Sequence, residues 1–472
     1  MLSSLTVKER ALNLGFDLAG IAPIGVWKDL EFSRQWVEKG FNGEMRYLEN
    51  PKRFDPRLIL PSAKSVICVG LIYNAGLRIQ ESGVRSQNKE RSAEVPMASC
   101  HGLRTTDNGQ FPVSIFQFPD SAGPTPRAWI SRYAWGHDYH EMMGARLEQL
   151  RAAVEGLAPG IETRAFVDTG PVVERAFARF SGIGWMGKNT CIINQEKGSW
   201  FFLGVILTSL ALAPDLPAPD RCGSCTACLD ACPTEALVEP YVMDASRCIS
   251  YFTIEIKSAI PERFRPKIGG NVFGCDICQD VCPWNGSHQL SVLSHQQATS
   301  QQRQQAFSYQ PSAISYQQAA SPQLHSSDKS CVRDSATTNV PQFHPMTVAL
   351  AYPRTEGGGV REQLSTNHGR QTTDHRRMTP DDGPRTTDTA SFSLFNPPLD
   401  ALASFSESDF RRIFAHSPIK RAKYRGWLRN LCVAMGNSGD ERFVPWLERA
   451  AQHSDSTVRE HAAWALERLR GK

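Results

Sequence analysis

The sequence predicts an α/β (or α+β) domain, a cysteine-rich segment and an all-α C-terminal region, in that order. Strand-like and helix-like apolar runs alternate before residue 213, which is typical of a sheet covered by helices. Eight cysteines crowd into residues 222–282, and capping signals with helical periodicity mark the residues after 393. A chain of 472 residues is long enough for two or three domains.

The first domain is predicted to cover residues 1–212. The run 65–73 (SVICVGLIY) is apolar and rich in β-branched residues, as in a buried strand. Residues 79–127 are polar and lack a clear period, so we expect a surface insertion or a disordered loop there. The other expected elements are helices at 7–13, 139–157 and 172–181 and strands at 163–168 and 199–207.

A second polar segment is expected at residues 287–392. Eleven glutamines fall between Gln289 and Gln323, and the stretch that follows is rich in Thr, Asp, Gly and Arg. Such a composition buries too little apolar surface to offset the entropy lost on ordering. We expect this segment to be disordered and to carry no chemistry.

The C-terminal region, residues 393–472, is predicted to be helical. Ser417 followed by Pro418 is a helix-start signal, and Gly436 stands where a left-handed helix terminator is expected. The run 457–460 (TVRE) is a capping-box pattern that opens a last helix. One apolar face of that helix is expected to hold Val458, Ala462, Ala465, Leu466 and Leu469. Paired helices of this length resemble one hairpin of a helical repeat.

Composition and charge leave the partner open. The formal charge of +4 and pI near 8.4 are mildly basic, so nucleic-acid binding would need a local concentration of Lys and Arg. The N-terminus lacks the apolar region of a signal peptide, and the longest apolar run, 200–213, is interrupted and too short to span a bilayer. We expect a soluble, cytoplasmic protein without membrane association.

The cysteines form two motifs. Cys222, Cys225, Cys228 and Cys232 precede Pro233 in the pattern C-x2-C-x2-C-x3-C-P, which is typical of a ferredoxin that binds [4Fe-4S] clusters. A second run, Cys275, Cys278 and Cys282 before Pro283, lacks the first cysteine of that pattern. Cys248 is the obvious substitute.

Crossed ligation, as in two-cluster ferredoxins, assigns every cysteine of this segment. The first cluster is predicted to take Cys222, Cys225, Cys228 and Cys282, and the second to take Cys232, Cys248, Cys275 and Cys278. A pair of zinc sites is the alternative, but zinc favours paired C-x2-C elements over three-thiolate runs that end in proline.

The other cysteines are not expected to bind metal. Cys68, Cys191 and Cys432 lie in apolar contexts and are interpreted as packing residues. Cys100 and Cys331 fall in the two polar insertions.

The chain resembles the epoxyqueuosine reductase family outside those two insertions. The resemblance rests on seven stretches: 132–140 (RYAWGHDYH), 167–190 (VDTGPVVERAFARFSGIGWMGKNT), 198–208 (GSWFFLGVILT), 222–237 (CGSCTACLDACPTEAL), 247–255 (RCISYFTIE), 273–285 (FGCDICQDVCPWN) and 417–430 (SPIKRAKYRGWLRN). It implies a cobalamin-binding α/β domain, a ferredoxin-like domain at 213–286 with two [4Fe-4S] clusters, and a HEAT-like region that helps to hold tRNA. It also implies the reaction, the reduction of epoxyqueuosine to queuosine at the wobble position of tRNA, the last step of queuosine biosynthesis.

The resemblance places the catalytic acid at Asp168, in the stretch that reads VDTGPVVER. Opening an epoxide leaves an alkoxide that must be protonated, so we expect a carboxyl group with a raised pKa. Asp168 follows an expected strand and precedes an expected helix, and the alternative reading is a helix N-cap.

Contacts to cobalamin are predicted for Asp168 and for residues in or near family-like stretches. These are Arg57, Lys188, Asn189, Ser250 and Asp276. The loop 187–190 is not a P-loop, because Asn189 stands where that motif needs Ser or Thr. His140 lies in a near match to a cobalt-ligand pattern, but a structural histidine is the favoured reading.

Contacts to tRNA are predicted where cations gather. Five of them occur without an acidic residue between positions 417 and 430, a pattern that indicates phosphate contacts or, alternatively, a solvated face. Arg175 is a further candidate, with a solvated ion pair as the alternative. The five are Lys420, Arg421, Lys423, Arg425 and Arg429.

Two other functions compete with this reading. A corrinoid iron–sulfur reductase of a small molecule, similar to a reductive dehalogenase, would share the cofactors but does not need a basic helical C-terminus. A non-enzymatic electron carrier does not need the long family-like stretch before Cys222. The favoured reading implies an unidentified low-potential electron donor as partner, and we expect a monomer.

Overall fold

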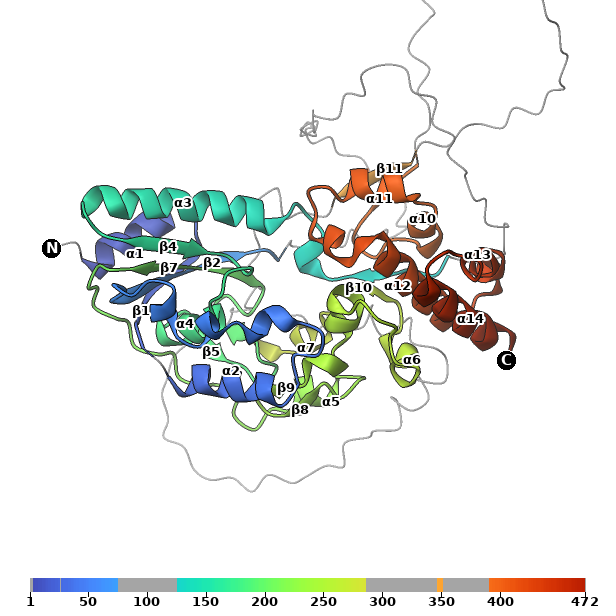
Figure 1. The fold of residues 1–472 in the computed structure, drawn as a ribbon, viewed down its shortest axis with the longest axis horizontal. Helices are drawn as coiled ribbons and strands as arrows, with labels where there is room; N and C mark the ends of the chain where they lie inside the picture. The colour runs from blue at the N-terminus through green and yellow to red at the C-terminus, as the bar shows by residue number, and fades with distance from the viewer. Residues whose placement is uncertain (1–2, 26, 75–124, 286–345, 351–389, 472) are drawn as a thin grey trace, which may run out of the picture.

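The computed structural model describes residues 3–25, 27–74, 125–285, 346–350 and 390–471 (Figure 1). The predictions for 79–124, for most of 287–392 and for Cys100 and Cys331 lie outside these residues. In Figure 1 the N-terminal sheet with its helices forms one end of the described molecule and the C-terminal helices form the other.

The N-terminal domain is built on a four-stranded sheet of order β1-β2-β7-β4, in which every neighbouring pair is antiparallel. Its two long strands confirm the expected strands at 65–73 and 199–207. The bounds are β1 Leu18–Pro23, β2 Ser65–Ile72, β4 Thr163–Phe166 and β7 Phe201–Thr208. Strand β4 is shorter than the strand expected at 163–168, because it ends at Phe166.

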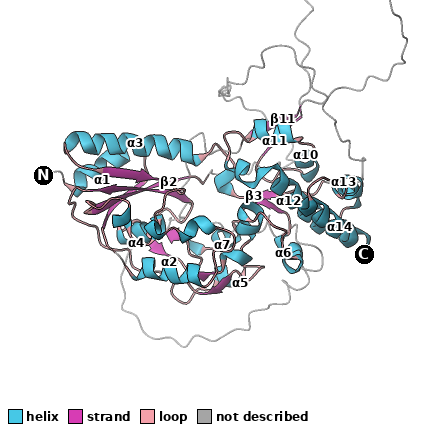
Figure 2. Cartoon of the chain, viewed as in Figure 1, coloured by secondary structure: helices cyan, strands magenta, loops and turns pink. Residues whose placement is uncertain are grey.

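Helices cover both faces of this sheet, as Figure 2 shows. Every residue of β2 is therefore buried, which explains its unbroken apolar sequence. One face packs on α1 (Ser4–Asn13) and α3 (Tyr139–Leu157), which confirm two predicted helices. The other face packs on α4 (Glu174–Phe180) and on Trp27, the residue before α2 (Lys28–Glu38).

The cysteine-rich segment folds into short elements. Two one-turn helices, α5 (Ala227–Asp230) and α7 (Ile277–Asp280), each lie within one of the two cysteine motifs. The remaining elements are β8 Leu237–Glu239, β9 Val242–Met243, η5 Ala245–Arg247, η6 Tyr251–Glu255, η7 Glu262–Phe264, α6 Arg265–Ile268, β10 Asn271–Phe273 and η8 Pro283–Asn285. The strands β8 and β9 form a hairpin, and η6 is a π-helical turn.

Residues 125–135 contact both the cysteine-rich segment and the C-terminal helices. The short strand β3 (Trp129–Ile130) pairs in parallel with β10, and Trp135 packs in the core of the C-terminal helices. Arg132 and Asp280 form a buried ion pair of 2.6 Å between these residues and the cysteine-rich segment. The three predicted domains therefore share a core and are not separate bodies along the chain.

Small corrections apply at the edges of the two predicted insertions. Arg127 pairs with Pro398 in a β-bridge, so the first insertion ends before it. Inside the second one, β11 (Thr347–Leu350) and β12 (Ala390–Ser393) form an antiparallel pair, and Met346 bonds through its main chain to Trp135. Main-chain pairing gives these residues order that their side-chain pattern did not indicate.

The C-terminal region is helical, as predicted. Ser417 caps a 3-10 turn, η10 (Pro418–Ala422), which leads into α12 (Lys423–Ser438). The other elements are α10 Leu399–Ala403, α11 Glu407–Ile413, η11 Glu441–Phe443, α13 Val444–Ala450 and α14 Ser456–Arg470. The residue that caps the last helix is Asp455, whose carboxylate accepts two main-chain N–H bonds, and not Thr457. The five predicted apolar residues of this helix are buried. None of the helices formed by the described residues is long and apolar enough to cross a membrane.

The predicted terminator Gly436 is wrong, since α12 continues to Ser438 and ends at Gly439, which has a φ of 68°. Gly436 lies inside the helix, where α12 crosses α14. A Cβ atom there would stand 2.9 Å from both the Cα and the Cβ atoms of Ala465. The glycine is therefore needed for close helix packing and not for a turn.

We predict that Gly436→Ala lowers the free energy of unfolding by about 1–3 kcal/mol, because the added methyl group forces the two helices apart. The matched control is Gly144→Ala on α3, where nothing lies within 4 Å of the added Cβ. That control should raise the stability by about 0.5–1 kcal/mol through helix propensity. Urea denaturation measures both, and equal effects would contradict the packing argument.

Candidate active site and cluster sites

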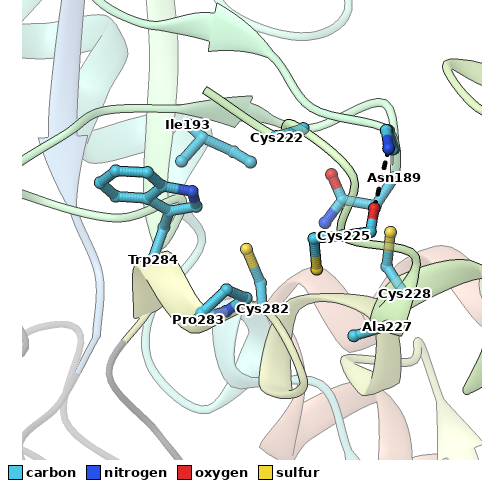
Figure 3. Close-up of a pocket in the computed structure, with 10 residues that line it drawn as sticks. Asn189, Ile193, Cys222, Cys225, Ala227, Cys228, Cys282, Pro283 and Trp284 are labelled. Carbon is cyan, nitrogen blue, oxygen red and sulfur yellow. Dashed lines mark hydrogen bonds between the residues drawn. The ribbon is translucent and has the colours of Figure 1, made fainter. Parts of the chain in front are cut away.

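The first predicted cysteine set lines one cavity (Figure 3). Cys222, Cys225 and Cys228 come from the first motif, and Cys282 reaches the cavity from the second motif. Burial raises the pKa of Cys228 to about 11 and that of Cys282 to about 12. These thiols therefore need a bound cation to become thiolates at neutral pH, which is the chemistry of an iron–sulfur site.

Protein groups complete the wall of that cavity. Lys188 donates from its Nζ atom to the carbonyl oxygens of Gly223 (2.7 Å) and Cys225 (2.9 Å), which fixes the loop that carries the first cysteines. Ile193 and Trp284 close the apolar side. This set of four thiols fits the ligand requirement of a [4Fe-4S] cubane.

The second predicted set also lies together. Burial raises the pKa of Cys275 well above its ordinary value, and the charges of Cys248 and Cys232 raise it further, as expected for neighbouring thiols. Main-chain N–H groups face two of the sulfur atoms: that of Ala236 donates to the Sγ atom of Cys232 at 3.3 Å, and those of Ser250 and Tyr251 favour the Cys248 thiolate.

One cysteine was misjudged from the sequence. The thiol of Cys191 forms a hydrogen bond with Cys278, and this bond lowers the pKa of Cys191 and raises that of Cys278. Cys191 therefore contacts a predicted ligand of the second cluster and is more than a packing residue. Cys68 and Cys432 are buried in apolar cores, as predicted.

Asp168 occupies a turn of unusual geometry after β4. Its φ of 53° lies in the left-handed region, and the N–H of Thr169 donates to the carbonyl oxygen of Val167 at 2.6 Å. A bond that skips one residue around a positive φ is the rare, strained form of the γ-turn. The alternative reading of Asp168 as a helix cap is wrong, because the residue at the cap position of α4 is Val173.

Three side chains meet the Oδ2 atom of Asp168. Tyr139 donates from its hydroxyl at 2.8 Å, the Nε2 atom of His140 lies at 3.3 Å, and Arg421 donates at 3.2 Å. Tyr139 and His140 begin α3, whereas Arg421 comes from η10 in the C-terminal region. About 41% of the Asp168 side chain remains exposed, so a substrate can reach the carboxylate.

The proton in this cluster sits on His140. Burial raises the pKa of Asp168, but the hydrogen bond from His140 and the charge of Arg421 outweigh it and hold that pKa well below its ordinary value. Burial lowers the pKa of His140, but hydrogen bonds to Asp138 and Asp168 raise it to about 9. The expected raised pKa of Asp168 is therefore wrong: its partners make it a carboxylate beside an imidazolium.

His140 is held from both sides. Its Nδ1 atom lies 2.7 Å from the Oδ1 atom of Asp138, whose other oxygen meets the Nζ atom of Lys420 at 2.8 Å. Because carboxylates occupy both ring nitrogens, His140 is not placed as a metal ligand in this structure.

Sequence reasoning missed several residues around this cluster. Arg421 also meets Glu255 at 2.9 Å and the hydroxyl of Tyr47 at 3.3 Å. The main-chain N–H of Asp168 donates to the Oε1 atom of Glu174 at 2.6 Å, and burial raises the pKa of Glu174 to about 8. Glu174, Tyr139 and Glu255 stand in the family-like stretches, so the resemblance held a signal for them. Tyr47 lies outside those stretches.

Four of the residues predicted to contact cobalamin find protein partners instead. Lys188 and Asn189 face the first cysteine cavity, and Asn189 also donates to the carbonyl oxygen of Cys278 at 3.0 Å. Both carboxylate oxygens of Asp276, which is buried, accept hydrogen bonds from Ser131 and from the main chain of Arg132. Arg57 is exposed and pairs with Asp55. The structure gives no support for these contacts as a set; Asp168 and Ser250 stay predictions.

The predicted tRNA contacts divide in the same way. Arg429 is buried and donates to the carbonyl oxygens of Phe252 and Ile256, so its predicted contact with tRNA is wrong. Lys423 and Arg425 are exposed at the start of α12. Lys420 and Arg421 belong to the Asp168 cluster, and Arg175 is exposed and donates to the carbonyl oxygen of Thr190.

The fold and the two cysteine sets define an iron–sulfur oxidoreductase with a separate acid–base site. The family described as a 4Fe-4S double cluster binding domain matches residues 221–285, and the one described as Epoxyqueuosine reductase QueG, DUF1730 matches residues 114–169. The epoxyqueuosine reductase of Xanthomonas campestris is 30% identical over 98% of this chain and 94% of its own length. That of Pseudomonas aeruginosa is 32% identical over 98% and 93%. The chain belongs to the epoxyqueuosine reductase family.

Solved structures of that family share the fold. The epoxyqueuosine reductase of Streptococcus thermophilus superposes with a TM-score of 0.63 at 24% identity, over 99% of this chain and 90% of that one. An epoxyqueuosine reductase solved with an epoxyqueuosine-modified stem loop of tRNA-Tyr gives a TM-score of 0.63 at 24% identity, over 98% and 89%.

The raised pKa of His140 predicts a pH dependence of stability. A folded-state pKa of about 9 lies above the ordinary 6.5, so the stabilisation is complete below pH 6.5 and is lost as the pH rises towards 9. His140→Gln should lose less unfolding free energy across this interval than the wild type, by about 1–2 kcal/mol, because water partly screens the pairs. Denaturant titrations at pH 6.5 and 9 measure the unfolding free energy of both proteins. An equal change in that free energy between the two pH values in the wild type and in His140→Gln would contradict the ion pairs.

Crossed ligation makes a second prediction. Cys282→Ala removes a ligand of the first cluster although it lies in the second motif, so reconstituted protein should lose about four of about eight iron atoms. The control is Cys432→Ala, a buried cysteine away from both sets, which should keep its iron. Iron analysis with electron paramagnetic resonance measures the change, and retention of both cluster signals in Cys282→Ala would contradict the assignment.

Proposed function

We propose that this chain reduces epoxyqueuosine to queuosine at the wobble position of tRNA. Membership of the family supports the proposal, together with the solved relative that holds a modified tRNA stem loop. The observation that carries it is the Asp168 carboxylate, held by Tyr139, His140 and Arg421 and still open to solvent.

Removal of the epoxide oxygen consumes two electrons and two protons and releases water, leaving a carbon–carbon double bond. The clusters supply electrons one at a time. The chain must then deliver protons to the oxygen that leaves carbon. Asp168 is proposed to relay a proton in this step. Its contact with His140, whose pKa is raised to about 9, supports this role, because the proton can pass through Asp168 as negative charge grows on that oxygen.

Arg421 gives this site a second function. A guanidinium beside the carboxylate stabilises developing negative charge, and its bonds to Glu255 and Tyr47 fix its position. The hydroxyl of Tyr139 donates to the same carboxylate oxygen and holds it in place. The geometry of the Asp168 carboxylate thus depends on the C-terminal region, which carries Arg421.

The cofactors follow from the residues and the family. We assign the first cluster to Cys222, Cys225, Cys228 and Cys282 and the second to Cys232, Cys248, Cys275 and Cys278, as in the sequence prediction. Cobalamin stays a proposal that rests on the resemblance. Four of its predicted contacts are engaged elsewhere or exposed, so we derive no step from it.

The tRNA partner is proposed to meet the exposed cations at the start of α12. Lys423 and Arg425 are exposed and do not take part in the contacts to Asp168 described above. Arg175 on α4 is also exposed and donates to the carbonyl oxygen of Thr190. Phosphate contacts at such residues make binding fall steeply with salt. We further propose a cytoplasmic monomer that receives electrons from a separate low-potential donor, with its three domains within 1–212, 213–286 and 393–472.

Asp168→Asn tests the proposal. The amide keeps the size of the side chain but cannot relay a proton, so kcat on epoxyqueuosine-modified tRNA should fall by about 10²–10⁴-fold with iron content and KM unchanged. The control is Glu38→Gln, the same chemical change on an exposed residue of α2, which should keep full activity. Wild-type turnover by Asp168→Asn would remove this residue from the mechanism.

A further inference from the structure

The turn that presents Asp168 needs a contact from another element to keep its conformation. Its γ-turn carries a positive φ at a residue with a side chain, which is a conformation that L-residues leave when nothing opposes it. Within the turn, the main-chain N–H of Thr169 donates to the carbonyl oxygen of Val167. A neighbouring element must therefore hold the main chain of Asp168 if its carboxylate is to stay in place.

Glu174 makes that contact. It is the first residue of α4, and its carboxyl group reaches back across six residues to accept the main-chain N–H of Asp168 at 2.6 Å. The next turn of α4 anchors it, because Ala176, Phe177 and Ala178 are buried against the sheet. The acceptor is thus fixed to the core, while the donor belongs to the strained turn.

A second contact limits where the turn can go. A Cβ atom on Gly170 would lie 2.4 Å from the ring of Phe166, so the chain after Asp168 folds directly onto that ring. Arg53 donates to the carbonyl oxygen of Val172 at 3.0 Å, just before α4. The turn is therefore held at its far end by packing and at Asp168 by Glu174.

We propose that Glu174 is a positioning residue, which holds the main chain of Asp168 so that its carboxylate meets Tyr139, His140 and Arg421. This inference rests on the proposed catalytic role of Asp168. Glu174 acts on Asp168 through the hydrogen bond to its main-chain N–H and not through the carboxylate. Its effect should therefore appear in the order of the turn first and in turnover as a consequence.

Charged groups around Glu174 are consistent with this role. Asp168 faces it from the turn, Arg53 faces it from η2 (Pro51–Arg53), and Arg175 is its neighbour on α4. Burial and the charge of Asp168 raise the pKa of Glu174 to about 8, so at neutral pH it is a neutral acceptor that does not repel the Asp168 carboxylate.

The test compares Glu174→Gln with Glu174→Met. Glutamine keeps an acceptor oxygen, whereas methionine keeps most of the volume and has none. We expect Glu174→Met to speed hydrogen exchange of the Asp168 amide by at least about tenfold and to lower kcat by about 10–100-fold, with KM for modified tRNA unchanged. Glu174→Gln should retain both properties within about threefold.

Glu141→Met is the matched control. Glu141 also stands in the first turn of a helix, and its ion-pair partner among the described residues is the exposed His416. It should change neither amide exchange at Asp168 nor turnover. Melting temperatures of all variants are measured in parallel, because exchange at residue 168 can be read in any variant that remains folded.

The outcomes separate the two proposals. Unchanged exchange at Asp168 in Glu174→Met, or loss of turnover in Glu174→Gln equal to that in Glu174→Met, overturns the positioning role. Absence of turnover in the wild-type enzyme on epoxyqueuosine-modified tRNA overturns the proposed function, and an active Asp168→Asn enzyme overturns the catalytic role of Asp168. In either case the exchange result still decides whether Glu174 holds the turn.

Discussion

The ion cluster around Asp168 ties the two ends of the chain together. Its carboxylate receives Tyr139 and His140 from α3 of the N-terminal domain and Arg421 from η10 of the C-terminal region. Because these ion pairs are partly buried, removal of one charged side chain leaves its partner with an uncompensated charge, which destabilises the folded state. The active site therefore exists only when both regions are folded against each other.

The same elements connect this cluster to the cysteine sets. Helix α4 begins at Glu174, which holds Asp168, and its next residue, Arg175, donates to the loop at Thr190. Two residues of that loop, Lys188 and Asn189, bond to carbonyl oxygens in the two cysteine motifs. A series of hydrogen bonds between side chains and main-chain groups thus joins the Asp168 turn to the two cysteine motifs.

Much of the fold could be predicted from the sequence, because it depends on local patterns. The strand β2 and the helix at 139–157 could be predicted from their apolar residues. The cysteine spacing predicted that Cys282 joins the first motif, and Cys282 does line the cavity of that motif. Contacts between distant residues left no such pattern. Arg429 and Arg421 look alike in the sequence, yet one is buried against main-chain carbonyls and the other meets Asp168. Gly436 is a packing residue because of Ala465, which no local rule reveals.

The protonation of His140 tests the central claim most directly, since the cluster assigns the proton to its ring and leaves Asp168 as a carboxylate. Nitrogen-15 NMR of histidine-labelled protein can follow the ring through a pH titration. The account predicts a titration midpoint for His140 near 9, shifted towards the ordinary value in Asp168→Asn. A midpoint near 6.5 in the wild type would contradict it.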